Sequence, residues 1–421
     1  MLDLRLIRRD PDAVRAALAR RGESDVGRLD RVIELDARRR EILPRLEGLR
    51  AEQNAANQAI AAAKKAGEGA DEAIAKMRAV ASEAKGLNDE LATVDADLTP
   101  ALAQLPNLPD ETAAPQDTVL REVGEPWVPE WPVRDHLELA GPDRIDTERG
   151  ARLSGSRFAY LRGDVARLEL SLVSWVLDLL SEQGFEPVIP PVLVREEALY
   201  GTGFLPDTEQ QIYHLPADDL YLVGTSEVAL ASLHAGEILE ALPMRYAGFS
   251  PCFRREAGAA GKDTRGIFRV HQFDKVEMFS FVEPSAARDE HERLLAIEES
   301  IMQALNLPYR VVNIAVDDLG ASAAKKYDIE AWLPSQKRYR ELTSTSNTTD
   351  YQARRLEIRY RPDGAGGKAK PEVVHTLNGT AVAVGRTLIA VLENGQQEDG
   401  SVALPEALRA YGAPASLPPA G

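Results

Sequence analysis

Two apolar stripes in the first hundred of 421 residues restrict the fold more than any other pattern. Each stripe repeats at alternating steps of three and four residues, with Arg39 and Gln53 as polar members of the first, which is typical of one face of a long helix. Residues 66–70, which include two glycines, separate them. Two helices with matching stripes favour an antiparallel coiled-coil hairpin, each roughly 45 Å long at 1.5 Å per residue. The stripes consist of Val32, Leu35, Ile42, Leu46, Leu49, Ala56 and Ile60, and of Ala73, Met77, Val80, Ala84, Leu87, Leu91, Val94 and Leu98.

Pro44 falls inside the first predicted helix. Because proline lacks an amide proton and crowds the preceding turn, we expect a kink there. A helical arm of this kind serves either protein association or RNA binding, and the pattern alone leaves both alternatives open.

The rest of the chain predicts a linker, a body and a tail. Proline and polar residues at 105–116 predict a linker after an N-terminal domain of residues 1–104, whose arm spans about 28–99. Residues 117–411 form the predicted body, and residues 412–421 are expected to be disordered.

In the body, strand-like runs alternate with a few helices, which indicates an α+β fold built on antiparallel hairpins. The expected strands are 221–223, 243–255, 267–282, 309–313, 356–360 and 373–377, and the expected helices are 165–183, 286–305 and 385–393. Neither a Rossmann glycine fingerprint nor a phosphate-loop motif is present in the sequence, so the other common nucleotide-binding folds lose support.

Composition narrows the class of protein. The single cysteine, Cys252, has no disulfide partner, and the six histidines lack zinc-ligand spacing, so we expect no zinc. The sequence has neither a signal peptide nor a long uncharged apolar window, which favours a cytoplasmic protein without a membrane segment. The net charge is −17, but residues 1–100 carry only −1, so any RNA contact should fall mainly there.

One predicted hairpin gathers chemically useful side chains. Strand alternation places Arg254 and Glu256 on one face, and Arg269, His271 and Phe273 on one face of the next strand. A ten-residue loop rich in glycine, residues 257–266, joins the two. Such a pair of strands can hold a triphosphate, although taken alone the pattern also fits a solvated sheet edge with ion pairs.

Three further segments favour the triphosphate-binding hairpin over a solvated sheet edge. They are Thr225-Ser226-Glu227, Glu341-Leu342-Thr343-Ser344 and the run from Leu377 to Thr387. With the hairpin and the arm, their order and spacing from Met1 to Tyr411 resemble seryl-tRNA synthetases of the bacterial type, a family of class II aminoacyl-tRNA synthetases. The resemblance implies a class II antiparallel sheet flanked by helices and preceded by the coiled-coil hairpin. It also implies a homodimer formed through residues 165–191, where Pro191 matches the motif 1 proline.

The implied activity is ATP-dependent ligation of L-serine to tRNA(Ser) through seryl-adenylate, with Mg²⁺ as cofactor; whether tRNA(Sec) is also charged stays open. This chemistry needs charge neutralisation and positioning rather than a nucleophilic side chain. The family's catalytic positions match Arg254, Glu256 and Arg386. The implied ATP-binding set is Arg254, Arg255, Glu256, Arg269, Val270, Phe273, Glu341, Leu342, Thr343, Ser344 and Arg386, with Glu341 and Ser344 also holding magnesium.

The resemblance also implies a serine site and a tRNA-binding arm. The serine-binding set is Thr225, Ser226, Glu227, Arg254, Glu277, Asn378 and Thr380, and the candidate phosphate contacts are Arg50, Lys64, Lys65, Lys76, Arg78 and Lys85. Two positions depart from the family pattern. Position 380 is often serine in the family and is threonine here. Gly395 stands where the family commonly has an aromatic residue, so we expect a small cavity beside Gly395.

Two other functions are weaker. A ligase that loads a carrier protein would lack the arm, whereas this chain has its pattern. A non-catalytic RNA-binding or regulatory paralogue would show erosion at Arg254, Glu256, Glu277 or Arg386, and all four are present.

Overall fold

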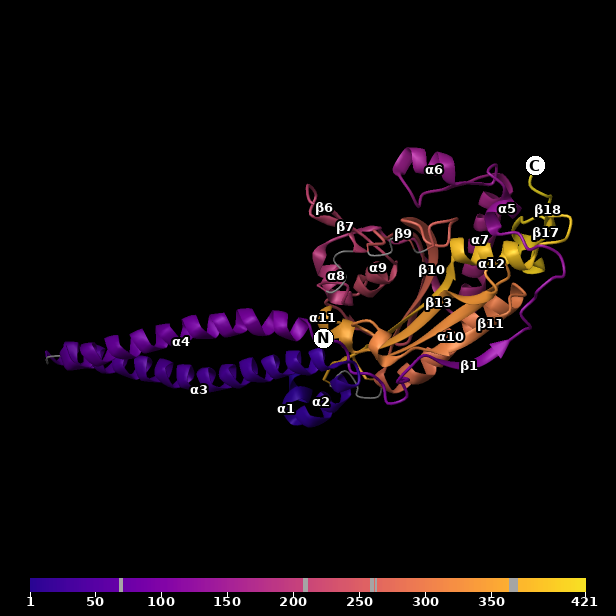
Figure 1. Cartoon of the computed structure of the whole chain (residues 1–421). Helices are drawn as coiled ribbons and strands as arrows, with labels where there is room; N and C mark the ends of the chain where they lie inside the picture. The colour runs from indigo at the N-terminus through magenta and orange to yellow at the C-terminus, as the bar shows by residue number, and fades with distance from the viewer. Residues whose placement is uncertain (68–70, 207–210, 258–260, 262, 363–369) are drawn as a thin grey trace. The chain divides into compact units, whose positions relative to one another are not determined.

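The computed structural model describes residues 1–421 except 68–70, 207–210, 258–260, 262 and 363–369, and except the side chain of Lys64. The chain separates into two compact units, Leu2–Pro106 and Asn107–Gly421, and Met1 belongs to the second. The first unit is helical, and the second contains every β-strand of the described chain (Figure 1).

Two long helices dominate the first unit. They are α3 (Glu23–Ala66) and α4 (Asp71–Ala103), which follow the short helices α1 (Leu4–Arg9) and α2 (Pro11–Ala19). α3 and α4 pack side by side in antiparallel directions (Figure 1), which confirms the predicted coiled-coil hairpin. Pro44 lies inside α3, and the kink expected there stays a prediction.

The apolar stripes form the contact between these two helices. Ile42 and Leu46 are each 1% exposed, and Leu46 packs in a cluster with Leu49 and Ala84. Arg39, a polar member of the first stripe, reaches Asp95 on α4 at 2.8 Å. Further ion pairs across the two helices join Arg31 to Asp97, Arg38 to Glu90 and Arg45 to Glu83. Exposed ion pairs each contribute at most about 1 kcal/mol. The buried apolar stripes therefore contribute more to the stability of the hairpin than these ion pairs do.

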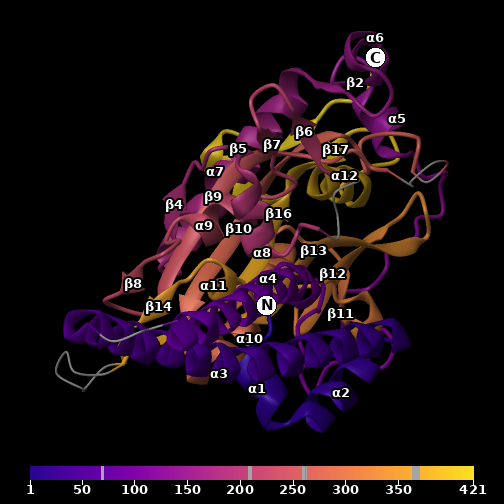
Figure 2. The same cartoon turned by 90° about the vertical axis from the view of Figure 1, so that its left-hand side faces the viewer.

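The second unit is built on an eight-stranded sheet with the order β1-β11-β12-β13-β16-β10-β9-β4. The strands from β11 to β4 can be followed across Figure 2. All neighbouring strands are antiparallel except β4 and β9. The strands are β1 (Thr118–Val123), β4 (Glu186–Val188), β9 (Met244–Phe253), β10 (Gln272–Val282), β11 (Tyr309–Asn313), β12 (Lys325–Leu333), β13 (Arg338–Thr349) and β16 (His375–Ala383).

Smaller elements surround this sheet. The helices are α5 (His136–Ala140), α6 (Thr147–Ser154), α7 (Gly163–Glu182), α8 (Glu196–Thr202), α9 (Glu227–Ser232), α10 (Ala287–Ala304), α11 (Tyr351–Arg355) and α12 (Val384–Asn394). The short strands are β2 (Ile145–Asp146), β3 (Tyr160–Leu161), β5 (Leu193–Val194), β6 (Tyr213–Leu215), β7 (Leu220–Leu222), β8 (Ile238–Leu239), β14 (Arg359–Tyr360), β15 (Glu372–Val373), β17 (Val402–Ala403) and β18 (Ser416–Leu417).

Helix α10 packs against β13, β16 and β10, the strands that carry the candidate site. His291 of α10 is buried and hydrogen bonds to Thr345 O at 3.1 Å, which ties the helix to β13. The main core joins α10, α7 and α12 to the sheet through fully buried side chains such as Leu294, Leu172 and Leu388. The antiparallel sheet with packed helices confirms the predicted α+β class.

Two central strands, β12 and β13, were not predicted as strands. The sequence of β13 from Arg338 to Thr349 is mostly polar, so it lacks the apolar alternation that indicates a strand. It lies between β12 and β16 in the sheet, and its buried side chains include Thr343 and Thr345. Threonine is β-branched and favours strands, which is the signal that apolar periodicity misses.

The predicted strand ends around the central hairpin are wrong. β9 ends at Phe253 and β10 begins at Gln272, its ladder partner, so the connecting segment is residues 254–271 rather than 257–266. Glu256 has φ of +50°, a left-handed conformation outside the β region, so an extended strand cannot continue through this residue. Arg254, Glu256 and Arg269 therefore lie in the connection and not on the paired strands. Part of the predicted loop, 258–260 and 262, lies outside the described residues.

Two expectations near the C-terminus are also corrected. Residues 416–417 form β18, which pairs with β17, and Leu417 is fully buried, so the segment 412–421 is not the expected disordered tail. The small cavity expected at Gly395 is absent from this part of the described chain, because a Cβ there would lie 2.2 Å from Ala403 O. Ala403 N donates to Gly395 O at 2.8 Å, so the chain after α12 fills the space an aromatic ring would need.

Candidate active site

A cavity of about 210 Å³ lies among β10, β13, β16 and the segment 254–271. It brings together most of the predicted residues from distant parts of the sequence. Its lining includes Thr225, Glu227, Arg254, Glu256, Arg269, Val270, Phe273, Glu277, Glu341, Leu342, Thr343, Ser344, Asn378, Thr380 and Arg386. The hairpin is therefore part of a cavity wall and not merely a solvated sheet edge.

Two guanidinium groups line this cavity from different directions. Arg254 donates through Nε to Gly224 O at 3.2 Å, and its guanidinium lies 5.3 Å from the centre of the Phe273 ring. Arg386, near the start of α12, donates to Glu341 O at 3.0 Å. Both arginines are held by backbone oxygens, which leaves other N–H groups for a ligand. Positive charge is thus fixed at two points of one cavity.

The connection 254–271 is cross-linked by its own charges. Arg269 donates to the carboxylate of Glu256, and Arg340 of β13 makes a two-pronged ion pair with Asp263 at 2.8 and 3.0 Å. The Arg340 guanidinium also lies 3.8 Å from the centre of the Phe268 ring, and Arg386 lies 4.8 Å from the same ring. Planar guanidinium groups stack on aromatic faces in this way.

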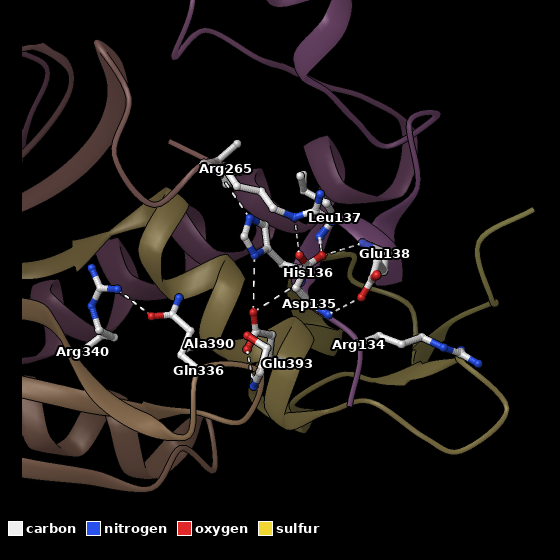
Figure 3. A network of polar contacts seen from close by, with 12 residues as sticks. Arg134, Asp135, His136, Leu137, Glu138, Arg265, Gln336, Arg340, Ala390 and Glu393 are labelled. Atoms are coloured by element: carbon white, nitrogen blue, oxygen red, sulfur yellow. Dashed lines mark hydrogen bonds and ion pairs between the residues drawn. The ribbon is translucent and has the colours of Figure 1, made fainter. Parts of the chain in front are cut away.

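The end of this connection is anchored by the buried side chain of His136, at the start of α5 (Figure 3). Its Nε2 accepts from the Ile267 amide at 3.3 Å, so Nδ1 carries the proton and faces Glu393 Oε1 at 3.4 Å. A side chain at Gly266 would collide with the ring, since a Cβ would lie 2.1 Å from Nε2. Arg265 adds an ion pair to Asp135 at 2.7 Å.

Glu393 of α12 completes the anchor. Its Oε1 accepts from the His136 amide at 3.3 Å, and its Oε2 accepts from the Ser335 amide at 3.2 Å. Since α12 also carries Arg386, the contacts of Glu393 and His136 connect the helix to the segment that carries Phe268 and Arg269.

A β-bulge sets which side chains of β13 share a face. Ile329 pairs with Thr343 and Glu330 pairs with Glu341, so Leu342 is an extra residue on β13. The bulge lets Glu341 and Ser344 both reach the cavity although they are three positions apart. The Thr343 hydroxyl instead donates to Glu298 Oε2 of α10 at 3.1 Å, so its side chain points away from the cavity.

Glu341 and Ser344 supply oxygen atoms of the kind that Mg²⁺ prefers. Burial alone would raise the pKa of Glu341, but Arg386, Lys326 and Arg254 together hold this pKa below its usual value. An ionised carboxylate and a hydroxyl that line the same cavity are suitable ligands for such an ion. The described residues contain no cluster of three His, Cys, Asp or Glu side chains placed to hold a metal by themselves.

At the other end of the cavity, side chains from the three elements β10, β16 and α9 form a polar network. Asn378 donates to Glu277 Oε1 at 3.1 Å and to Glu227 Oε2 at 3.3 Å, and Thr380 donates to Glu277 Oε2 at 3.3 Å. Burial, with Glu277 nearby, raises the pKa of Glu227 to about 7. The network places two carboxylates and a hydroxyl around a small space.

Lys275 also lines the cavity, although it was not among the predicted site residues. Its Nζ donates to the Thr225 hydroxyl at 2.8 Å and forms an ion pair with Glu277. Its position two residues before Glu277 on the same strand was the available signal, because strand alternation puts both on one face. Lys326 of β12 and Phe268 also line the cavity and were missed, Lys326 because its strand was not predicted.

Two predicted residues do not line the cavity. Arg255 is exposed, and its backbone amide donates to Gln211 O at 2.9 Å. Ser226 is fully buried, and its hydroxyl donates to Gly248 O at 3.3 Å, so it packs against β9.

Among the proposed tRNA contacts, Arg50, Lys65, Lys76, Arg78 and Lys85 are all exposed on α3 and α4. Arg50 donates to Asn88 Oδ1 at 3.1 Å. The side chain of Lys64 lies outside the described residues.

Sequence comparisons match both units to known families. Residues 213–395 match the tRNA synthetase class II core domain (G, H, P, S and T), and residues 1–109 match the seryl-tRNA synthetase N-terminal domain. The serine–tRNA ligase of Thermobifida fusca is 52% identical over 98% of this chain and 97% of its own length. The serine–tRNA ligase of Acidothermus cellulolyticus is 52% identical over 98% of each chain.

A solved structure agrees over the full length. The crystal structure of seryl-tRNA synthetase from Pyrococcus horikoshii complexed with ATP has a TM-score of 0.94 and 41% identity, and each chain is covered completely.

The sheet, the cavity and the core-domain match define a class II aminoacyl-tRNA synthetase. With full-length relatives at about half identity, the chain belongs to the seryl-tRNA synthetase family of ATP-dependent serine–tRNA ligases. None of the helices among the described residues is both long and apolar enough to cross a membrane.

Proposed function

We propose that the cavity binds ATP and L-serine together, forms seryl-adenylate, and then passes serine to the 3′ end of tRNA(Ser). The observation that carries this proposal is the meeting of Arg254 and Arg386 at one cavity whose other end holds Glu227 and Glu277. Cations suit the phosphates, and carboxylates suit the ammonium group of an amino acid.

In the first step a carboxylate oxygen of serine attacks the α-phosphorus of ATP, and the bond to the pyrophosphate oxygen breaks. Arg254 bridges the α-phosphate and the serine carboxylate, because a guanidinium can donate two parallel hydrogen bonds. Arg269 binds the outer phosphates once its ion pair with Glu256 is broken. These groups hold the reactants together and offset negative charge as it grows on the phosphoryl oxygens.

The adenine ring binds between Phe273 and Arg386, and Glu256 accepts a hydrogen bond from its amino group. Val270, Leu342 and Thr343 also line the cavity. Glu341 and Ser344 hold Mg²⁺, which when bound neutralises phosphate charge. Arg255, being exposed, takes no direct part in this arrangement.

Serine is selected by charge, hydrogen bonding and size. Glu227 and Glu277 bind its ammonium group, and Thr380, with Thr225 and Asn378 nearby, faces its hydroxyl. A site that hydrogen bonds a hydroxyl rejects alanine, since its buried polar groups would be left unpaired. The methyl group of Thr380 narrows the wall against larger substrates.

The helical hairpin is the proposed tRNA-binding part, within a domain of residues 1–104. Its exposed cations contact the tRNA backbone, because side chains cannot read the deep groove of an A-form helix.

We also propose a cytoplasmic homodimer formed through α7 and β4. Ile189, 86% exposed, and Leu170, 63% exposed, support an interface on this surface. Whether tRNA(Sec) is a second substrate is decided by charging both purified tRNAs.

The experiment for the central proposal is ATP–pyrophosphate exchange with each amino acid in turn. We expect exchange with serine alone, and little with alanine or threonine. Absence of exchange with serine would falsify the assignment of the cavity.

A further inference from the structure

Gln352 of α11 is a fully buried residue that does not line the cavity, yet it touches a residue that does. Its Nε2 donates to Glu227 Oε1 at 2.7 Å and to Thr202 O of α8 at 3.2 Å. Both N–H bonds of the amide are therefore used, one of them on the carboxylate proposed to bind the serine ammonium.

The orientation of this amide is fixed from the other side. Gln352 Oε1 accepts from the Thr376 hydroxyl at 3.0 Å and lies 3.3 Å from the Thr348 hydroxyl. Thr348 in turn donates to Thr376 O at 2.7 Å, which leaves the Thr376 proton for Gln352. A flipped amide would turn its carbonyl oxygen toward the Glu227 carboxylate and Thr202 O, where oxygen would face oxygen.

This arrangement divides the two oxygens of Glu227. Oε1 is occupied by Gln352, whereas Oε2 lies near Asn378 Nδ2 at 3.3 Å, on the side of the other serine-binding residues. We infer that Gln352 is a positioning residue for substrate recognition, which holds Glu227 so that Oε2 faces the ammonium group of serine. The inference rests on the proposed serine site.

Gln352 also affects the charge of Glu227. Burial and Glu277 raise the pKa of Glu227 to about 7, while the hydrogen bond from Gln352 lowers it, as do the charges of Lys275 and Arg254. Removing the Gln352 donor raises this pKa further, because the ionised form loses a hydrogen bond. At neutral pH more of the enzyme would then carry a protonated Glu227, which binds an ammonium group weakly.

The test uses the full-length enzyme with Gln352→Leu, followed by serine-dependent pyrophosphate exchange from about pH 6 to 9. We expect the KM for serine at pH 7 to rise on the order of 10-fold, as for loss of a hydrogen bond to a charged group. The acidic limb of kcat/KM for serine should move to higher pH, and the KM for ATP should stay unchanged. Gln303→Leu, which removes an exposed glutamine that donates to Tyr309 Oη, is the matched control.

Thr376→Val provides a second route if Gln352→Leu does not fold. It removes the hydroxyl that fixes the Gln352 amide and should raise the serine KM and shift the acidic limb in the same direction. An unchanged limb, or equal rises in the KM for serine and for ATP, would overturn the inference by indicating a general structural role. Absence of serine exchange in the wild-type enzyme would instead refute the proposed function itself.

Discussion

Arg254 and Arg255 are neighbours in the sequence but occupy opposite environments. The first lines the cavity, and the second is exposed. We expect Arg254→Ala to lower kcat/KM for pyrophosphate exchange by about 10²- to 10³-fold, as when one donor to a developing charge is removed. Arg255→Ala is the control and should retain nearly full activity. Equal losses of pyrophosphate exchange in the two variants would contradict the proposal that Arg254 binds the reacting groups.

Glu298 is a buried acid beneath the strands of the site. It is fully buried, and within the described part of the chain its Oε1 has no hydrogen-bond partner. Burial raises its pKa well above the usual value for a carboxyl group. Because this pKa is higher in the folded than in the unfolded chain, its contribution to stability is greatest at acidic pH and is lost as pH rises.

The isosteric variant Glu298→Gln removes this titration. Urea unfolding should show equal stability near pH 4 and a relative gain for the variant at higher pH, at most about 1.4 kcal/mol per pH unit until the folded pKa is reached. A difference that is constant over this pH range would show that Glu298 does not titrate as described.

At the scale of elements, two irregularities in the sheet align the site. The extra residue Leu342 on β13 brings Glu341 and Ser344 to one cavity, and the shift between Val276 and Glu277 leaves Ala381 as an extra residue on β16. Bulges change the direction in which following side chains point. Regular strands would have given each of these two strands a different set of residues toward the substrates.

The anchor between α5, α12 and the segment 254–271 carries an element-scale prediction. His136→Ala leaves the Ile267 amide without its acceptor, at a cost of about 1 to 3 kcal/mol for a buried donor. Because Phe268 and Arg269 follow directly, we expect the KM for ATP to rise several-fold while the KM for serine changes little.

His214→Ala is a suitable control for His136→Ala, because His214 is exposed and stacks on Tyr221. If both KM values rose together in His136→Ala, the histidine would stabilise the fold without orienting the ATP end.

At the scale of the whole molecule, the two units predict separable activities. Arg31 of α3 and Asp97 of α4 form an ion pair at 3.1 Å, so the two helices are adjacent at the base of the hairpin and a short Gly/Ser linker can replace roughly residues 28–99. The second unit contains the whole cavity. We therefore expect this variant to keep pyrophosphate exchange with serine and to lose charging of tRNA(Ser).

A milder change tests the same proposal without removing the hairpin. Charge reversal at Lys76 and Lys85 should lower the rate at which serine is attached to tRNA(Ser). It should also make this rate less sensitive to salt, since binding with fewer phosphate contacts releases fewer counterions. Full charging after deletion of the hairpin would refute its role in binding tRNA.

The sequence by itself determined the helical hairpin, the α+β class and the family, because these depend on local periodicity and on residue types at characteristic spacing. It also predicted Arg254, Glu277 and Arg386 as candidate site residues, and all three line the cavity. It was wrong about strand ends at Glu256 and about the last ten residues, where a left-handed turn and the burial of Leu417 decide the outcome.

Only the tertiary structure decided which side of a strand each side chain faces and which polar groups meet. The bulge at Leu342 depends on pairing with β12, and the contact of Gln352 with Glu227 joins residues 125 positions apart. Such contacts arise from packing between distant segments, so no local pattern encodes them. A sequence names the chemical groups through short-range patterns, whereas their distances and ionisation depend on the environment that the folded chain creates around them.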